Sequence, residues 1–152
     1  MSREPQVPEG IVILDTNIVL DLFLFQDPRT AVLREQLQSK RLSWLATAHM
    51  RNELERVLTY AHISAKLSYY EKTPADILAA FDQAVQIYEQ PTAKAPYVCK
   101  DPDDQAFIDL AAQLAGQAPG QKVTLISKDK AVTSMRKRLE KLSVFVTTTL
   151  LA

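Results

Sequence analysis

Short apolar runs alternate with amphipathic segments along this chain, and the alternation limits the folds open to it. Residues 11–14 form a continuous, mostly β-branched run, which predicts a strand buried on both faces. Further strands are expected at 42–46, 123–127 and 144–146, with another candidate at 97–99. Strands separated by helical stretches favour an α/β fold of three layers, in which helices flank a parallel sheet of four or five strands joined by right-handed crossovers.

Capping residues and apolar periodicity indicate where the helices lie. Pro28 suits a first helical position, and Thr47 and Asp101 suit the position that caps a helix at its N-terminus. Apolar residues at three- and four-residue spacing then continue the amphipathic helices. The expected helices cover residues 28–37, 48–61, 63–70, 74–88, 102–116 and 129–141.

The length of 152 residues suits one domain, which we place at residues 10–152 after an N-terminal tail at 1–9. The longest stretch without acidic or basic residues, 110–121, is too short for a membrane helix, and the N-terminus lacks the pattern of a signal peptide. We therefore expect a cytoplasmic protein that does not bind a membrane. The single cysteine, Cys99, excludes an internal disulfide and a multi-cysteine zinc site.

The charges are balanced overall but unevenly distributed. Eighteen basic and eighteen acidic residues cancel, so the net charge gives no reason to expect a nucleic-acid partner. Residues 122–141, however, hold seven Lys or Arg against two acidic residues. A solvated helix face explains this segment, because exposed helices usually carry such side chains. Contact with a nucleic acid is the alternative that stays open.

Two acidic residues directly follow predicted strands. Asp15 comes after the strand at 11–14, and Asp129 comes after the strand at 123–127. The carboxyl ends of parallel strands lie at one edge of the sheet, where ligands bind, so both carboxylates are expected at the same edge. Capping of the following helix is the simpler interpretation of each residue taken alone.

Two more carboxylates lie on predicted helices next to apolar faces. At about 100° per residue, Glu53 falls about 60° from the apolar direction of its helix, and Glu55 falls about 140° from it. Asp104 points along the apolar side of its helix, whereas Asp109 falls on a side shared with two glutamines. A helix cap at Asp104, and an ion pair of Glu53 with a base such as Arg56, would explain these acids without a ligand.

A bound cation is the other explanation of these inward acids. A buried carboxylate costs free energy unless a donor or a cation compensates its charge. Mg²⁺ and Mn²⁺ prefer oxygen ligands, and Mg²⁺ often uses only a few protein carboxylates. The pattern thus indicates a site for one or two Mg²⁺ or Mn²⁺ ions, formed by Asp15, Glu53, Asp104 and Asp129.

Four acidic motifs in this order resemble those of PIN-domain ribonucleases. They are IVILDTN at 11–17, NELERVL at 52–58, DPDD at 101–104 and ISKD at 126–129. Each motif alone is weakly specific, but the ordered set extends over about residues 12–146. It is most similar to small bacterial PIN proteins described as toxin components of toxin–antitoxin systems. The resemblance implies a PIN-like fold with the strand order 3-2-1-4-5.

The resemblance also implies a role for each residue of the site. Asp15 would be the central metal ligand, Glu53 and Asp104 would complete the pocket, and Asp129 would bind the metal directly or through water. The residues implied to support these ligands, by hydrogen bonds or as an auxiliary acid, are Thr16, Asn17, Ser127 and Asp101.

The chain departs from the family pattern after its last acidic motif. Relatives often continue with an acid and a leucine, whereas Lys130 and Ala131 follow Asp129 here. This difference weakens the expected contribution of Asp129. It also makes Lys128 and Lys130 candidates for contact with a phosphate.

The function implied by the resemblance is metal-dependent hydrolysis of phosphodiester bonds in single-stranded RNA, which leaves 5′-phosphate and 3′-hydroxyl ends. One or two metal ions would activate water and stabilise the departing oxygen in such an endoribonuclease. As a toxin component, the protein would also bind a cognate antitoxin protein. The uncharged end of the chain after residue 142 makes a homodimer a further expectation.

Two other functions fit the same residues. The chain could be a non-catalytic PIN-like module that binds RNA or a protein partner. Alternatively, Asp15 could accept a phosphate covalently, as carboxylates at strand ends do in phosphatases and receiver domains. Asn17 replaces the second acid of the usual Asp-x-Asp phosphatase motif, and Lys128 would serve as the lysine of a receiver.

Overall fold

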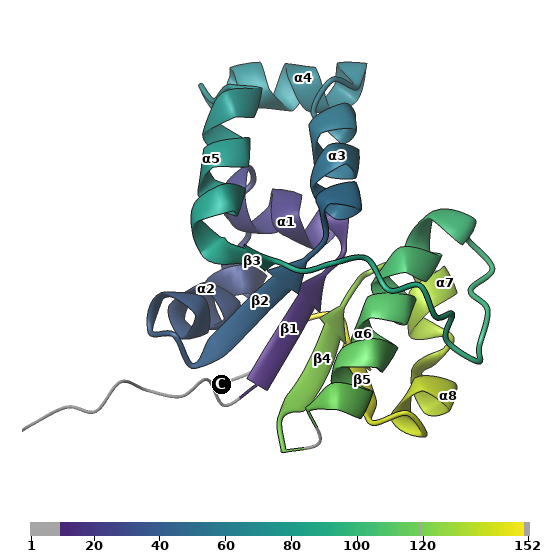
Figure 1. The fold of residues 1–152 in the computed structure, drawn as a ribbon. Coiled ribbons are helices and arrows are strands. Elements are labelled where there is room, and N and C mark those ends of the chain that lie inside the picture. The colour runs from purple at the N-terminus through teal and green to yellow at the C-terminus, as the bar shows by residue number, and fades with distance from the viewer. Residues whose placement is uncertain (1–9, 119, 151–152) are drawn as a thin grey trace, which may run out of the picture.

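The computed structural model describes residues 10–118 and 120–150, and at its centre is a sheet of five parallel strands (Figure 1). The order across the sheet is β3-β2-β1-β4-β5, which confirms the predicted α/β fold and strand order. The strands are β1 (Gly10–Leu14), β2 (Leu42–Ala46), β3 (Val85–Ile87), β4 (Lys122–Ile126) and β5 (Val144–Thr147).

Helices connect the strands, and several begin at the predicted caps. The Thr47 side chain accepts a hydrogen bond from Met50 N, and the Asp101 side chain accepts one from Asp103 N. None of the helices in the described part of the chain is both long and apolar enough to cross a membrane. The helices are α1 (Thr16–Phe23), α2 (Ala31–Gln38), α3 (Ala48–Val57), α4 (Ala61–Tyr69), α5 (Pro74–Ala84), α6 (Gln105–Gln117), α7 (Lys130–Thr133) and α8 (Arg136–Glu140), with 3-10 turns η1 (Pro28–Thr30) and η2 (Pro102–Asp104).

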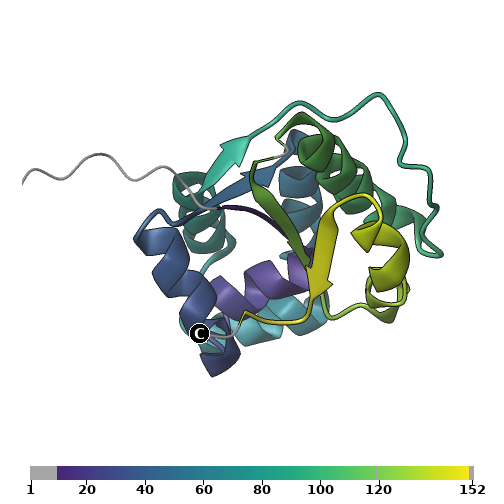
Figure 2. The same ribbon diagram turned by 90° about the horizontal axis from the view of Figure 1, so that it is seen from below.

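The sheet is covered on both faces, as its near-continuous apolar strands require. Figure 2 shows α1 and α2 on one side of the sheet and α6 and α8 on the other. On the α1 side, the Trp44 ring of β2 lies 5.9 Å from the Phe23 ring and 5.2 Å from the Phe81 ring of α5. On the opposite side, α6 packs against β4 and α8 packs against β5. The strands between these layers therefore form a rigid support for the residues at their ends.

The third strand lies at 85–87, where the sequence pattern predicted the end of a helix at 74–88. Val85 has an extended backbone, with φ −103° and ψ 156°, and it pairs with Trp44 of β2. Pairing with β2 therefore overrides the helical pattern for these residues, two of which are β-branched. The strand candidate at 97–99 is wrong, because the backbone there bonds to the side chain of Gln105 rather than to another strand.

Two helices also differ from the prediction. Helix α1 has no predicted counterpart, although its sequence is amphipathic, and six of its eight residues are buried. The helix predicted at 129–141 is divided into α7 and α8. A hydrogen bond of 3.0 Å from Met135 N to Val132 O tightens the backbone at this division.

Candidate metal centre

The neighbouring strands β1 and β4 bring Asp15 and Asp129 to one edge of the sheet. Leu14 pairs with Ile126 at the ends of these strands. The backbone N–H of Asp15 then donates to Ile126 O at 3.0 Å and continues the ladder. Both aspartates therefore lie at the carboxyl edge of the sheet, as the position of their motifs predicted.

Both aspartates also cap the helix that follows them. Asp15 Oδ1 accepts a hydrogen bond of 3.2 Å from Asn17 N, and Asp129 Oδ1 accepts one of 2.9 Å from Ala131 N. The capping interpretation is therefore correct for both residues. Each of these caps uses one oxygen, so capping leaves the second oxygen of each carboxylate available for another partner.

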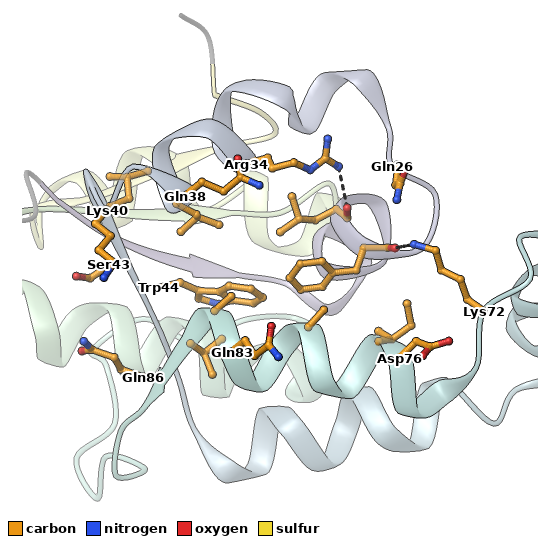
Figure 3. A pocket seen from close by; sticks show the side chains of 18 of the residues that line it. Gln26, Arg34, Gln38, Lys40, Ser43, Trp44, Lys72, Asp76, Gln83 and Gln86 are labelled. Atoms are coloured by element: carbon orange, nitrogen blue, oxygen red, sulfur yellow. Dashed lines mark hydrogen bonds between the residues drawn. The ribbon is translucent and has the colours of Figure 1, made fainter.

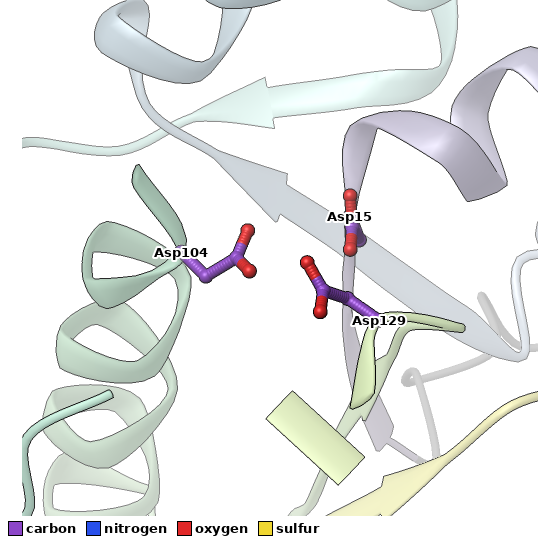
Figure 4. Close-up of side chains that lie close together, drawn as sticks. All are labelled: Asp15, Asp104 and Asp129. Atoms are coloured by element: carbon purple, nitrogen blue, oxygen red, sulfur yellow. The ribbon is translucent and has the colours of Figure 1, made fainter. Parts of the chain in front are cut away.

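The Asp104 side chain lies close to Asp15 and Asp129, and it comes from the start of α6 (Figure 4). It directly precedes α6, but its side chain makes no capping hydrogen bond, so capping does not explain its position. It is 6% exposed, and its Oδ2 atom has no hydrogen-bond partner among residues 10–118 and 120–150. One carboxylate oxygen from each of Asp15, Asp104 and Asp129 lies within 4.8 Å of the other two (Figure 4).

The cluster resists carrying three negative charges at once. Burial, a hydrogen bond with Asp129 and the charge of Asp15 raise the pKa of Asp104 to about 8. Burial also raises the pKa of Asp15, and the hydrogen bond from Ser127 opposes this effect. No Lys or Arg in the described residues forms an ion pair with any of the three aspartates.

These features fit a divalent cation with oxygen ligands. Three carboxylates at one point supply hard anionic donors of the kind that Mg²⁺ and Mn²⁺ prefer. A cation there would compensate the charge that burial penalises, and it would give Asp104 Oδ2 a partner. The arrangement can therefore hold a metal ion, and the aspartates come from three separate segments of the chain.

Glu53 lies near this cluster but is not one of its three members. It is a half-buried residue of α3, and burial followed by the charge of Asp15 raises its pKa. The charge of Arg56 acts in the opposite direction. The negative charge of Asp15 therefore acts on Glu53 as well, and Glu53 lies at the border of the cluster.

The expected supporting residues contact the cluster in different ways. Ser127 is fully buried; its Oγ donates to Asp15 Oδ2 at 2.6 Å and accepts from Asp129 N at 3.0 Å. Asn17 uses its backbone N–H, while the residue as a whole is exposed. Thr16 is buried at the start of α1. Asp101 caps the turn η2 and lies outside the group of three.

The two lysines named as candidate phosphate contacts differ in their surroundings. Lys128 forms an ion pair with Asp21 of α1, with 2.5 Å between Nζ and Oδ2. Lys130 is exposed at the first position of α7, next to Asp129. The charge of Lys128 is therefore engaged within the protein, whereas that of Lys130 faces solvent.

Gln105 and Asp109, which the sequence pattern did not identify, bind the segment that precedes Asp104. Gln105 Oε1 accepts from Cys99 N at 2.6 Å, and Gln105 Nε2 donates to Asp109 Oδ1 at 2.9 Å. Asp109 is only 3% exposed and also accepts from Ala95 N at 2.9 Å. Their shared helix side was visible in the sequence, but the loop that covers it is not predictable from helical periodicity.

A hollow of about 980 Å³ lies away from the three aspartates, between α2, α5 and β2 (Figure 3). Phe23 and Trp44 line it with apolar surface, and Lys72 donates from its rim to Phe23 O at 2.7 Å. None of the clustered aspartates lines this hollow, so the chemistry of the aspartates and the shape of the hollow belong to different parts of the molecule.

Comparison with known families agrees with this geometry. A family model described as PIN domain matches residues 11–131, which is more than half of the chain. The match includes Asp15, Asp104 and Asp129, which lie in the first and last parts of the matched region. No curated protein gives a significant match, and no solved structure does.

Proposed function

The chain belongs to the PIN-domain family, whose members are of the nuclease type, and on this basis we propose that it is a Mg²⁺- or Mn²⁺-dependent endoribonuclease. Its substrate would be single-stranded RNA, cleaved at phosphodiester bonds. The observation that carries the proposal is the group of three aspartates, two of them buried, in which Asp104 Oδ2 has no partner in the described chain. A group of this kind is costly without a cation.

Each residue of the group would have a separate task. Asp15, Asp104 and Asp129 would hold one or two cations, with Glu53 at their border. When bound, such a cation lowers the pKa of a coordinated water and neutralises charge on a phosphate. Ser127 would keep Asp15 oriented and ionised through its hydrogen bond to Oδ2. Asp104 would release its proton on loading, because a positive charge opposes the effects that raise its pKa.

The finer parts of the proposal rest on the likeness of the four acidic motifs to bacterial PIN toxins. We propose that the protein acts in the cytoplasm as a toxin component and that a cognate antitoxin protein binds it. The products would carry 5′-phosphate and 3′-hydroxyl ends. A homodimer is a separate proposal, which rests on the uncharged end of the chain from Leu142 onward.

A covalent phosphate on Asp15 is not favoured by these contacts. Both oxygens of Asp15 accept hydrogen bonds, and the side chain is buried. Lys128, the lysine that a receiver would need near its phosphate, pairs with Asp21 instead. A non-catalytic module that binds RNA or a protein partner is the remaining alternative, and the same experiment separates it from a nuclease.

The test compares metal binding with cleavage in matched variants. Calorimetry with Mn²⁺, and cleavage of a labelled single-stranded RNA with and without EDTA, should show binding and EDTA-sensitive cleavage by the unmodified protein. Asp15→Asn and Asp104→Asn should each lower cleavage at least about hundredfold, since each removes an anionic ligand. Asp82→Asn is the matched control, because Asp82 is an exposed aspartate paired with Arg51 of α3.

Three results would contradict the proposal in different ways. Equal cleavage by Asp15→Asn and the unmodified protein would exclude the aspartate site as the catalytic centre. Mn²⁺ binding without cleavage of any RNA would favour the binding module. Acid-stable phosphate on Asp15 after incubation with a phosphodonor would favour the covalent mechanism.

A further inference from the structure

Lys128 lies between two residues of the aspartate site, but its side chain faces away from the site. Its neighbours Ser127 and Asp129 both take part in the hydrogen bonds around Asp15. Side chains of an extended segment alternate in direction, and Lys128 accordingly reaches toward the opposite side. There its Nζ atom lies 2.5 Å from Asp21 Oδ2.

Asp21 belongs to α1, the helix that Asp15 caps. It follows Asp15 by six residues, which corresponds to roughly 120° around the helix axis and about 9 Å along it. The two acids of α1 therefore face different partners: Asp15 faces the cluster, and Asp21 faces Lys128. The ion pair thus connects α1 to the extended segment formed by residues 127–129.

The surroundings of this ion pair favour a fixed geometry. Asp21 is only 9% exposed, and the pair lines a hollow of about 240 Å³ together with apolar residues such as Ile18 and Ile126 and with polar residues that include Arg29. The Asp21 carboxylate is buried while the Lys128 side chain is 37% exposed, so loss of the lysine charge leaves a carboxylate in surroundings that penalise its charge. The backbone carbonyl of Asp21 also accepts from Asp27 N at 2.9 Å, which fixes the end of α1.

We infer that Asp21 and Lys128 form a positioning pair, which holds the extended segment 127–129 against α1 and thereby sets the separation of Asp15 and Asp129. The inference rests on the proposed function, because it concerns the residues that would hold the metal. Lys128 thereby orients the aspartates through its ion pair with Asp21, in contrast to the phosphate contact that its position in the sequence suggested.

The connections from the ion pair to the carboxylates are short. Lys128 is bonded directly to Ser127, whose Oγ donates to Asp15 Oδ2 at 2.6 Å. The same Oγ accepts from Asp129 N at 3.0 Å. A displacement of segment 127–129 therefore moves both the hydroxyl group that donates to Asp15 and the Asp129 carboxylate. Groups that orient metal ligands in this way typically change metal affinity about tenfold to a hundredfold when they are removed.

The test uses variants that break or keep the pair. Asp21→Asn removes one charge at constant size and leaves Lys128 able to reach water, since its side chain is 37% exposed. Lys128→Gln removes the other charge, Lys128→Arg keeps it, and Asp21→Asn with Lys128→Gln removes both. Asp82→Asn with Arg51→Gln is the matched control, because it breaks an exposed pair between α3 and α5.

Mn²⁺ affinity without RNA is the first measurement, made by calorimetry on variants that keep the circular dichroism spectrum of the unmodified protein. Asp21→Asn and Lys128→Gln should each weaken Mn²⁺ binding about tenfold or more, and the double variant should be no weaker than the worse single variant. Lys128→Arg should retain affinity within about threefold, and the control pair should bind as the unmodified protein does. Cleavage should show a lower kcat with an unchanged KM.

Two outcomes would overturn the inference. If Asp21→Asn binds Mn²⁺ as tightly as the unmodified protein does, the pair does not position the ligands. If Lys128→Gln instead raises KM and lowers the salt dependence of RNA binding by about one charge, while Asp21→Asn changes neither, Lys128 is a phosphate contact. An unmodified protein that binds no Mn²⁺ would overturn the proposed function itself, so the two failures are distinguishable.

Discussion

Replacement of Asp104 by asparagine should make the metal-free protein more stable at pH 8, although it removes a proposed ligand. The folded state raises the pKa of Asp104 from 3.8 to about 8, first through burial and then through its neighbours Asp129 and Asp15. Between these two pH values the folded protein keeps a proton that the unfolded chain releases. The stability of the unmodified protein should therefore fall as the pH rises through this window.

The magnitude follows from proton linkage. Each pH unit within the window costs about 1.4 kcal/mol, so a rise from pH 5 to pH 8 lowers the free energy of unfolding by up to about 4 kcal/mol. For a chain of this length, 1 kcal/mol corresponds to about 2–4 °C in Tm, and the expected decrease is about 10 °C. Asparagine does not titrate, and its amide can donate to Asp129 as the protonated Asp104 carboxyl does. The Tm of Asp104→Asn should therefore change much less over the same range.

The assay is thermal unfolding of both proteins in EDTA at pH 5, 6, 7 and 8. The difference between the two proteins at each pH isolates residue 104, because most other titrating groups are common to both. Saturating Mn²⁺ should narrow the difference between the two proteins at pH 8: at a hundred times Kd it adds about 2.7 kcal/mol to the unmodified protein and leaves the variant almost unchanged. A Tm of the unmodified protein in EDTA that stays parallel to that of the variant from pH 5 to pH 8 would refute the reasoning.

Three further substitutions test other parts of the structure. Ser127→Ala should lower the free energy of unfolding by about 2 kcal/mol, because Asp15 Oδ2 loses its donor; urea unfolding at pH 7 measures this, and an unchanged midpoint would contradict it. Gly10→Ala should destabilise the protein by about 1–3 kcal/mol, because a Cβ atom there would lie 2.9 Å from the backbone oxygen of Lys122; a Tm equal to that of the unmodified protein would show that β1 can shift. Gly116→Ala is its counterpart in α6, where a Cβ atom meets nothing within 4 Å, and it should raise stability by about 0.5–1 kcal/mol in the same melts.

Much of the fold could be predicted because its signals are local. The strands at β1 and β4 are continuous apolar runs, and Thr47 caps α3 through an atom three residues away. Such patterns depend on hydrogen bonds and periodicity within a few residues. The third strand was predicted at the wrong place because the extended backbone of Val85 depends on pairing with β2, which is distant in sequence.

The candidate site was partly predictable for the same reason. A position after a strand was enough to place Asp15 and Asp129 at one edge, and helical geometry was enough to turn Asp104 inward. That Glu53 lies beside the three aspartates and not among them was not predictable, because this depends on how α3 packs in the folded chain. The burial of Asp109 was also missed, since a loop distant in sequence covers it.

The order of residues along the chain was enough to predict a parallel α/β sheet with acidic residues at the ends of its strands, because each of these features depends on neighbours along the backbone. Which carboxylates meet, and the contact of Lys128 with Asp21, follow from the packing of the folded chain. Distances between side chains on different elements depend on the packing of every layer between them. A pattern along one segment carries no measure of that packing.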